Sequence, residues 1–120
     1  MTDELKPKLA PALERFTVED GPMTVELRSA GQGLKHIGGG IIRFDQGGSG
    51  QPWKLPYEEM LHVLTGTLRL RFGTEQLVAV PGDVVTVPRG AEVAYEGDPG
   101  TTAFYALTPA DWYRDHPNGL

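Results

Sequence analysis

Glycine and proline interrupt the second half of the chain at short intervals. The string PWKLPYEEMLHVLTGTLRLRFG runs from Pro52 to Gly73, and PGDVVTVPRGAEV follows from Pro81. Since both residue types favour turns and interrupt helices, the apolar runs between them predict short β-strands. One acidic residue, Glu59, precedes Gly66 by seven positions, with a predicted strand between the two. The spacing therefore indicates an all-β fold built around a few fixed turns.

About nine short strands are expected, in one domain with no internal repeat. In residues 67–72 leucine alternates with arginine, so the leucines face one side of the sheet and the arginines the other. Residues 60–64 form an apolar run, which suits a strand buried on both faces. Residues 38–40, three glycines, are expected to be a flexible lead into the next strand. The other predicted strands are 18–27, broken by a Gly-Pro pair, 41–44, 76–80, 84–87, 91–95 and 101–107.

The composition excludes several classes of protein and site. A chain of 120 residues has the size of one small domain and can bury one core. The net charge of -5 argues against non-specific binding to nucleic acid, and the absence of cysteine excludes disulfides and thiolate chemistry. The N-terminal residues are charged and contain two prolines, unlike a signal peptide, and no apolar run approaches the ~18 residues of a membrane span. We therefore expect a cytoplasmic protein with no nucleic-acid or membrane partner.

The segment from Pro52 onward, which glycine and proline interrupt, resembles the two sequence motifs of the cupin superfamily. In that family the first motif contains a glycine, a His-x-His pair, a glutamate and a final glycine, and the second contains Gly, Pro and Gly before a histidine. Glu59 and Gly66 match the end of the first motif, and the second is matched by Gly82, Pro88 and Gly90. The resemblance implies a small cupin barrel, a jelly roll also described as a double-stranded β-helix, in which the glutamate points inward.

The three metal-binding histidines of the cupin motifs are absent from this chain. The spacing of the motifs places Trp53 and Leu55 at the His-x-His pair and Val93 at the last histidine. A register shifted by one residue would instead place Pro52 and Lys54 at the pair. Trp, Leu and Val do not bind transition metals, and a lone carboxylate is a poor site for one. We therefore predict neither a metal nor another cofactor.

Within the cupins, the sequence is similar to the ethanolamine-utilization EutQ-like group over about residues 40–112. The similarity rests on a Trp-x-Leu-x-Tyr-acid-Glu string at residues 53–59 and on the segment FYALTPADW at residues 104–112. Lys54 and His62 depart from the Thr and Tyr that are usual in the group. The group is linked to ethanolamine breakdown and to an acetate kinase activity, which the resemblance implies as one candidate function. The sequence contains no GxxxxGK phosphate-binding loop that would support kinase chemistry.

The chain is expected to divide into three parts. We predict an N-terminal arm or short helix over residues 1–17, a cupin barrel over 18–112 and a C-terminal tail over 113–120. Small cupins commonly pair through their sheets and N-terminal segments, and the apolar strand at 60–64 fits such a contact. A C2 homodimer is therefore expected, since it is the commonest closed oligomer.

One candidate site follows from the inward position that the resemblance gives to Glu59. Its expected neighbours are apolar or aromatic, so the charged form is disfavoured and the pKa of the carboxyl should rise. A carboxyl that titrates near neutral pH suits general acid–base catalysis. The candidate catalytic residues are Glu59, Tyr57 and Tyr105, and the candidate residues that bind a small-molecule ligand are Trp53, Leu55, Val93, Tyr95 and Trp112.

Several of these residues have alternative roles. Each tyrosine could instead fill the core with its hydroxyl satisfied, and Phe104 rather than Tyr105 could be the inward residue of the last strand. Trp112 could close the end of the barrel or contact a second subunit. Lys54 would point inward in the shifted register, where a desolvated amine could form a Schiff base. His62 lies three positions from the glutamate, so it is expected on the opposite face, packed or at an interface.

Two classes of function follow from these patterns. The first is a metal-independent enzyme that binds a small organic molecule in the barrel and uses Glu59 in an isomerase, lyase or cyclase type of reaction. The second is a non-catalytic binding or scaffold protein that keeps the barrel for packing, and fold alone does not decide between them. A raised Glu59 pKa beside a pocket favours the enzyme, whereas an interior filled by Trp53, Leu55 and tyrosines favours the scaffold.

Overall fold

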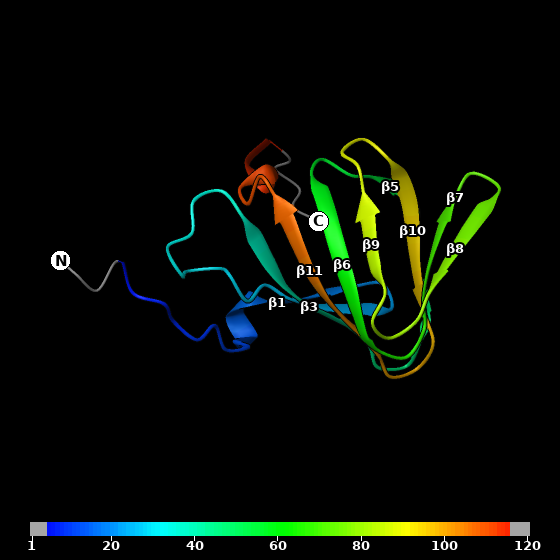
Figure 1. The fold of residues 1–120 in the computed structure, drawn as a ribbon, viewed down its shortest axis with the longest axis horizontal. Helices are drawn as coiled ribbons and strands as arrows, with labels where there is room; N and C mark the ends of the chain where they lie inside the picture. The colour runs from blue at the N-terminus through cyan, green and yellow to red at the C-terminus, as the bar shows by residue number, and fades with distance from the viewer. Residues whose placement is uncertain (1–4, 116–120) are drawn as a thin grey trace.

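Two antiparallel β-sheets face each other in the computed structural model, which describes residues 5–115 (Figure 1). The larger sheet has the strand order β1-β2-β3-β11-β6-β9. The smaller sheet has the order β4-β10-β7-β8, with β5 also paired to β10. The strands are β1 (Thr17–Asp20), β2 (Met23–Glu26), β3 (Gly38–Phe44), β4 (Gly48–Ser49), β5 (Trp53–Lys54), β6 (Glu58–Thr65), β7 (Leu68–Phe72), β8 (Glu75–Ala79), β9 (Val84–Val87), β10 (Glu92–Gly97) and β11 (Thr101–Thr108).

The predicted fold class is confirmed, with one difference in how the sheets meet. Apart from short 3-10 turns, the regular structure of the described residues is β. Among these strands β8 ends the smaller sheet and β9 ends the larger one, and the two do not pair with each other. The molecule is therefore an open sandwich with the strands of a cupin rather than a closed barrel.

The glycines before the third strand have a different role from the one predicted. Residues Gly38, Gly39 and Gly40 are the first part of β3 itself, paired to β11, and not a flexible lead. A Cβ on Gly40 would lie 1.8 Å from the carbonyl oxygen of Glu26 at the end of β2. Glycine is required because the two backbones approach more closely than any side chain would allow.

Strand β6 is buried on one face only, so the prediction that residues 60–64 are buried on both faces was wrong. Leu61 and Val63 point into the sandwich and are each 1% exposed, whereas Met60 and Leu64 point outward and are 52% and 43% exposed. The reason is that no described element covers the outer face of the larger sheet at this strand. His62 lies on this outer face and is exposed, opposite to Glu59 as predicted.

The core lies between the two sheets and includes the leucines of β7. Leu68 and Leu70 point inward and are buried, as their alternation with arginine predicted. Arg69 and Arg71 point outward and each donates a 2.8 Å hydrogen bond to the carboxylate of Glu96 on β10. Among the side chains that are fully buried, the largest are Phe44, Leu55, Leu61, Leu68, Val63 and Thr101.

The N-terminal segment lies beside the larger sheet. Residues 5–13 precede the 3-10 turn η2 (Glu14–Phe16), which leads into β1. The Nε of Arg28 donates a 2.6 Å hydrogen bond to the carbonyl oxygen of Ala10 and anchors this segment. A groove of about 460 Å³ separates the segment from the outer face of β3 and β11, with Phe104 in its wall.

The C-terminal 3-10 turn η3 (Trp112–Asp115) follows β11 at the end of the sandwich where β5 also lies (Figure 1). Most of the predicted tail, residues 116–120, lies outside the described part of the chain, as do residues 1–4 of the predicted arm. No helix among residues 5–115 has the length and apolar character needed to cross a membrane.

Candidate functional site

Glu59 lies inside the sandwich near the end at which β6 begins. Its strand neighbours are Leu107 on β11 and Val87 on β9, and the alternation of β6 turns its side chain inward. The residue is 8% exposed, in a cluster of otherwise apolar and aromatic side chains. A carboxyl group in such surroundings requires a polar partner.

That partner is Tyr95, which comes from β10 in the opposite sheet. The Tyr95 hydroxyl donates a hydrogen bond of 2.5 Å to Oε1 of Glu59. Burial raises the pKa of the Glu59 carboxyl from its ordinary value of 4.5 to about 7, and the hydrogen bond from Tyr95 opposes this rise. The carboxyl is therefore able to exist in either protonation state near neutral pH.

Two further tyrosines lie close enough to Glu59 for its charge to affect the pKa of their hydroxyls. Tyr57 and Tyr105 are both buried, and burial followed by the Glu59 charge raises the pKa of each hydroxyl above its usual value. The same two causes raise the pKa of Tyr95. All three hydroxyls thus remain protonated and can donate hydrogen bonds.

On the last strand, Tyr105 and not Phe104 is the inward residue. Tyr105 is 4% exposed, whereas Phe104 is 46% exposed on the outer face. The Tyr105 hydroxyl reaches the carbonyl oxygen of Glu26 at 3.5 Å. This distance is at the limit of a hydrogen bond, so the hydroxyl is only weakly held.

An aromatic cluster closes this end of the sandwich. The ring centroid of Trp112 lies 5.7 Å from that of Trp53 and 5.1 Å from that of Tyr57. Trp53 and Tyr57 meet edge to face with centroids 5.9 Å apart. Trp112, at 9% exposed, thus covers Trp53 and Tyr57, as expected of a residue that closes the end.

The positions that hold histidines in metal-binding cupins carry no metal ligands in this fold. Leu55 and Val93 are buried at 1% and 4% exposed, and Trp53 on β5 pairs with Val93 on β10. Lys54 is exposed, so it does not form the internal pair with Glu59 that the shifted register allowed. Among residues 5–115 no three or more His, Cys, Asp or Glu side chains gather as a metal site would require.

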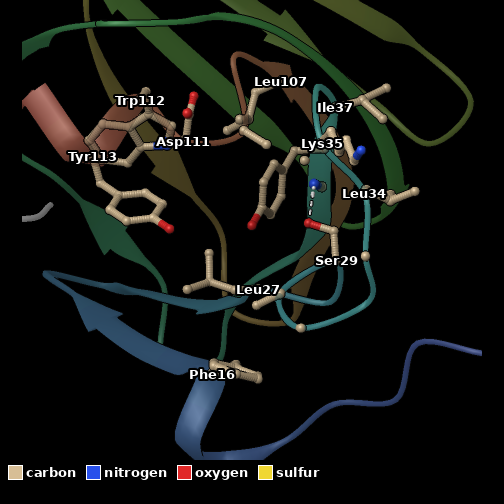
Figure 2. Close-up of a pocket in the computed structure, with 17 residues that line it drawn as sticks. Phe16, Leu27, Ser29, Leu34, Lys35, Ile37, Leu107, Asp111, Trp112 and Tyr113 are labelled. Carbon is tan, nitrogen blue, oxygen red and sulfur yellow. Dashed lines mark hydrogen bonds between the residues drawn. The ribbon is translucent and has the colours of Figure 1, made fainter. Parts of the chain in front are cut away.

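A cavity of about 740 Å³ opens beside this cluster, between η2, η3 and the loop that follows β2 (Figure 2). Of the sequence-predicted site residues, Tyr105 and Trp112 line it, whereas Glu59 does not. The complete lining is Phe16, Leu27, Ser29, Ala30, Gly31, Gly33, Leu34, Lys35, Ile37, Gly38, Gly39, Tyr105, Leu107, Ala110, Asp111, Trp112 and Tyr113.

Glu59 and the cavity have side chains as common neighbours. Leu107 lines the cavity and is the residue paired with Glu59 across the β11–β6 ladder. Trp112 lines the cavity as well and contacts Trp53 and Tyr57. The predicted site residues are therefore brought together in the interior, and two of them, Tyr105 and Trp112, also line the cavity.

The sequence interpretation did not single out Glu26, which is buried at the end of β2. Its carboxylate accepts a 2.8 Å hydrogen bond from Nη1 of Arg28 and a second bond from Nη1 of Arg43. Hydrogen bonding to Asp45 is the largest cause of the raised Arg43 pKa, and Glu26 contributes to it. No sequence pattern marked this residue, because Glu26 lies on the outer face of the sheet, paired with Ile41, whereas Val25 and its partner Ile42 face inward. The cavity residues Phe16, Leu27 and Tyr113 carried no signal either.

Comparison with known sequences finds one matching family and several relatives. A sequence model of the family described as ethanolamine utilisation protein EutQ matches residues 15–114. The acetate kinase EutQ of Salmonella typhimurium is 39% identical over 62 residues, which are 51% of this chain and 27% of that protein. The acetate kinase EutQ of Escherichia coli is 33% identical over 51% of this chain and 26% of its own length. The chain thus spans about a quarter of the length of these curated relatives.

Solved structures extend the similarity over most of the chain. The EutQ protein of Clostridium difficile matches with a TM-score of 0.73 at 20% identity, covering 85% of this chain and 82% of that one. The polyketide cyclase RemF of Streptomyces resistomycificus matches with a TM-score of 0.68 at 18% identity, covering 88% and 78%. At these identities both structures show the shared fold alone. Because the family match covers nearly the whole of the described region, this chain belongs to the family of the ethanolamine utilisation protein EutQ.

Proposed function

We propose that this EutQ-family protein binds a small organic molecule at the aromatic end of the sandwich and transfers a proton to or from it through Glu59. The observation that carries the proposal is the buried Glu59 carboxyl, whose pKa is raised to about 7 and which accepts a 2.5 Å hydrogen bond from Tyr95. A group whose pKa lies near the working pH can serve as both acid and base.

The tyrosines around Glu59 supply the second element of such chemistry. Tyr57, Tyr95 and Tyr105 are protonated donors in a buried environment, where a hydrogen bond to a developing oxyanion is stronger than in water. Tyr105 also lines the cavity. In the proposed reaction Tyr105 contacts the bound molecule, while Glu59 exchanges the proton.

Because Glu59 is only 8% exposed, we infer that the aromatic end of the sandwich opens when a ligand reaches its carboxyl. Trp112 belongs to a 3-10 turn of four residues, Trp112–Asp115, and not to either sheet. Trp112 lines the cavity, and its ring contacts those of Tyr57 and Trp53. We infer that a change in the Trp112 side chain joins the cavity to the interior, which also keeps bulk water from Glu59 between turnovers.

The type of acid–base reaction rests on analogy, and a kinase function has less support. The fold of RemF shows that a sandwich of this kind accommodates a polyketide cyclase, which makes an isomerase, lyase or cyclase reaction feasible here by analogy alone. The curated relatives are named acetate kinases, but residues 5–115 include neither a glycine-rich phosphate loop nor a helix longer than a 3-10 turn to bind a phosphate at its N-terminus. No feature of the described residues therefore favours phosphoryl transfer over acid–base chemistry.

Solvent-deuterium exchange tests the proposal without knowledge of the natural substrate. A panel of 1,3-dicarbonyl and β-hydroxycarbonyl compounds is incubated in D₂O with the protein, and loss of their acidic C–H signals is followed by proton NMR. We expect catalysed exchange for at least one compound, slowed by about 10²–10⁴-fold in Glu59→Gln. Glu58→Gln is the matched control, because the adjacent Glu58 is exposed on the outer face. Equal exchange rates in the two variants would contradict a role for Glu59, and binding without exchange would identify a non-catalytic binding protein.

A further inference from the structure

Four aromatic side chains from three separate elements meet at the 740 Å³ cavity. Phe16 comes from η2, Trp112 and Tyr113 from η3, and Tyr105 from β11. Trp112 and Tyr113 meet edge to face, with ring centroids 6.2 Å apart. Figure 2 shows the rings of Trp112 and Tyr113 on one side of the space, with Phe16 and Leu27 below them. Ring faces and edges arranged in this way favour stacking or edge contacts with another flat ring.

Several large apolar side chains around this cavity are left open to solvent. Leu34, Ile37 and Tyr113 are 58%, 52% and 52% exposed, and all three belong to the cavity lining. A cluster of exposed apolar side chains around a concavity is typical of a surface that a ligand covers. The volume of about 740 Å³ falls within the roughly 300–1,000 Å³ of small-molecule sites.

Two tyrosine hydroxyls provide polar contacts in the cavity, beside the hydroxyl of Ser29, which accepts a hydrogen bond from the Gly39 amide. The Tyr105 hydroxyl is held only by its 3.5 Å contact to the Glu26 carbonyl oxygen, in contrast to the 2.5 Å bond of Tyr95. It can therefore donate to a ligand without losing a strong internal bond. In Figure 2 the hydroxyl of Tyr113 is directed across the cavity toward Leu27.

The charged residues of the lining do not define the interior of the cavity. In Figure 2 the carboxylate of Asp111 points away from the space between Tyr113 and Leu27, and Lys35 lies on the side opposite to Tyr113. The two side chains have opposite charges, so the site has no net preference for an anion or a cation. The geometry favours an uncharged ligand.

We propose that the cavity binds a planar, uncharged aromatic molecule of fused rings that carries a phenolic or carbonyl oxygen. Its rings pack against Trp112, Tyr113 and Phe16, and its oxygen accepts a hydrogen bond from Tyr105. This inference rests on the proposed function for the identity of the site and adds the chemical class of the ligand. The test of this proposal measures ligand binding alone, whereas the proton-transfer proposal is tested by deuterium exchange. A failure of one proposal can therefore be distinguished from a failure of the other.

Calorimetric titration with 2-naphthol tests this assignment, and quenching of tryptophan emission locates the bound probe. Ala30→Phe places a phenyl ring in the cavity lining and should abolish saturable binding. Val78→Phe is the matched control, since it adds the same ring at a position that is 57% exposed on β8, and it should bind like the wild type. Tyr105→Phe should weaken binding by about threefold to tenfold, the loss of one hydrogen bond.

A saturated probe separates ring packing from general hydrophobic binding. Decahydro-2-naphthol has the same bicyclic frame and hydroxyl but no aromatic face, so it should bind at least about tenfold more weakly than 2-naphthol. Melting curves identify any variant that fails to fold. If Ala30→Phe does not fold, Tyr105→Phe and the saturated probe still test the proposal. Equal binding of the two probes, or unchanged 2-naphthol binding in folded Ala30→Phe, would overturn the proposal.

Discussion

The hydroxyl of Tyr95 on β10 donates a 2.5 Å hydrogen bond to Oε1 of Glu59 on β6, so a buried polar contact joins the two sheets of the sandwich. Both side chains are surrounded by apolar and aromatic residues of the core. Such a contact stabilises the fold only as long as both partners are present, because either one alone would be a buried polar group without a partner.

Tyr95→Phe removes this hydrogen bond and should raise the pKa of Glu59 further, since the bond opposes the effect of burial. We expect a loss of about 1–3 kcal/mol of unfolding free energy at about pH 8, where the carboxyl is charged, and a smaller loss at about pH 5. Urea unfolding at the two pH values measures both. Tyr113→Phe, at a tyrosine that is 52% exposed, is the control and should change little. Equal losses at both pH values in Tyr95→Phe would contradict the assigned bond.

Glu59→Gln should change how stability depends on pH. The folded-state pKa of about 7 lies above the ordinary value of 4.5, so the folded protein binds more protons than the unfolded chain between these values. Wild-type stability should therefore fall as pH rises through this window, by roughly 3 kcal/mol in all. The variant should lack this decline and be the more stable protein at about pH 8. Glu58→Gln should keep the wild-type slope, and a wild type with no decline would contradict the raised pKa.

Trp112→Ala should open the aromatic end of the sandwich. Trp112 is 9% exposed and its ring contacts Trp53 and Tyr57, so its removal uncovers both of them. We expect a loss of roughly 3 kcal/mol of unfolding free energy, as for other buried aromatic truncations. The emission of Trp53, then the only tryptophan, should shift to longer wavelength and become accessible to acrylamide. A Trp53 as protected as in the wild type would show that Trp112 does not close this end.

The outer face of the larger sheet should bind a second copy of the chain. Met60, Phe104 and Val84 are 52%, 46% and 56% exposed on adjacent strands, and His62 pairs with both Phe104 and Val84. An apolar, uncharged strip can be self-complementary, which is the requirement for a C2 contact. Light scattering of the wild type should give a dimer mass, and Phe104→Glu should give a monomer that still folds. A monomeric wild type at micromolar concentration would contradict the homodimer.

The general fold could be read from the sequence because its signals are local. The alternation of leucine and arginine in β7 set the inward face of that strand, and the spacing of Gly82, Pro88 and Gly90 marked the turns around β9. Glu59 could be placed for a similar reason, since its motif fixes which side of β6 it occupies. The choice of Tyr105 over Phe104 as the inward residue could not be made from sequence, because it depends on the register of β11 against β6.

The errors arose where a distant neighbour decides the outcome. Gly40 belongs to a regular strand because it pairs with Tyr105 on β11, and it is a glycine because the Glu26 carbonyl approaches it closely. Both contacts join positions far apart in the chain. Met60 and Leu64 are apolar yet exposed, because no described element covers the outer face of β6. The cavity could not be predicted at all, since it is assembled from three separate stretches around residues 16, 27–39 and 105–113.

The most direct test of the account is the titration of the Glu59 carboxyl itself. Infrared difference spectra between the wild type and Glu59→Gln isolate the carbonyl stretch of the protonated Glu59 side chain as a function of pH. With its carboxyl buried and bonded to Tyr95, Glu59 should lose this band with a midpoint of about pH 7. A midpoint near 4.5, the ordinary value for glutamate, would contradict the account, because Glu59 would then be fully ionised at neutral pH and unable to act as an acid.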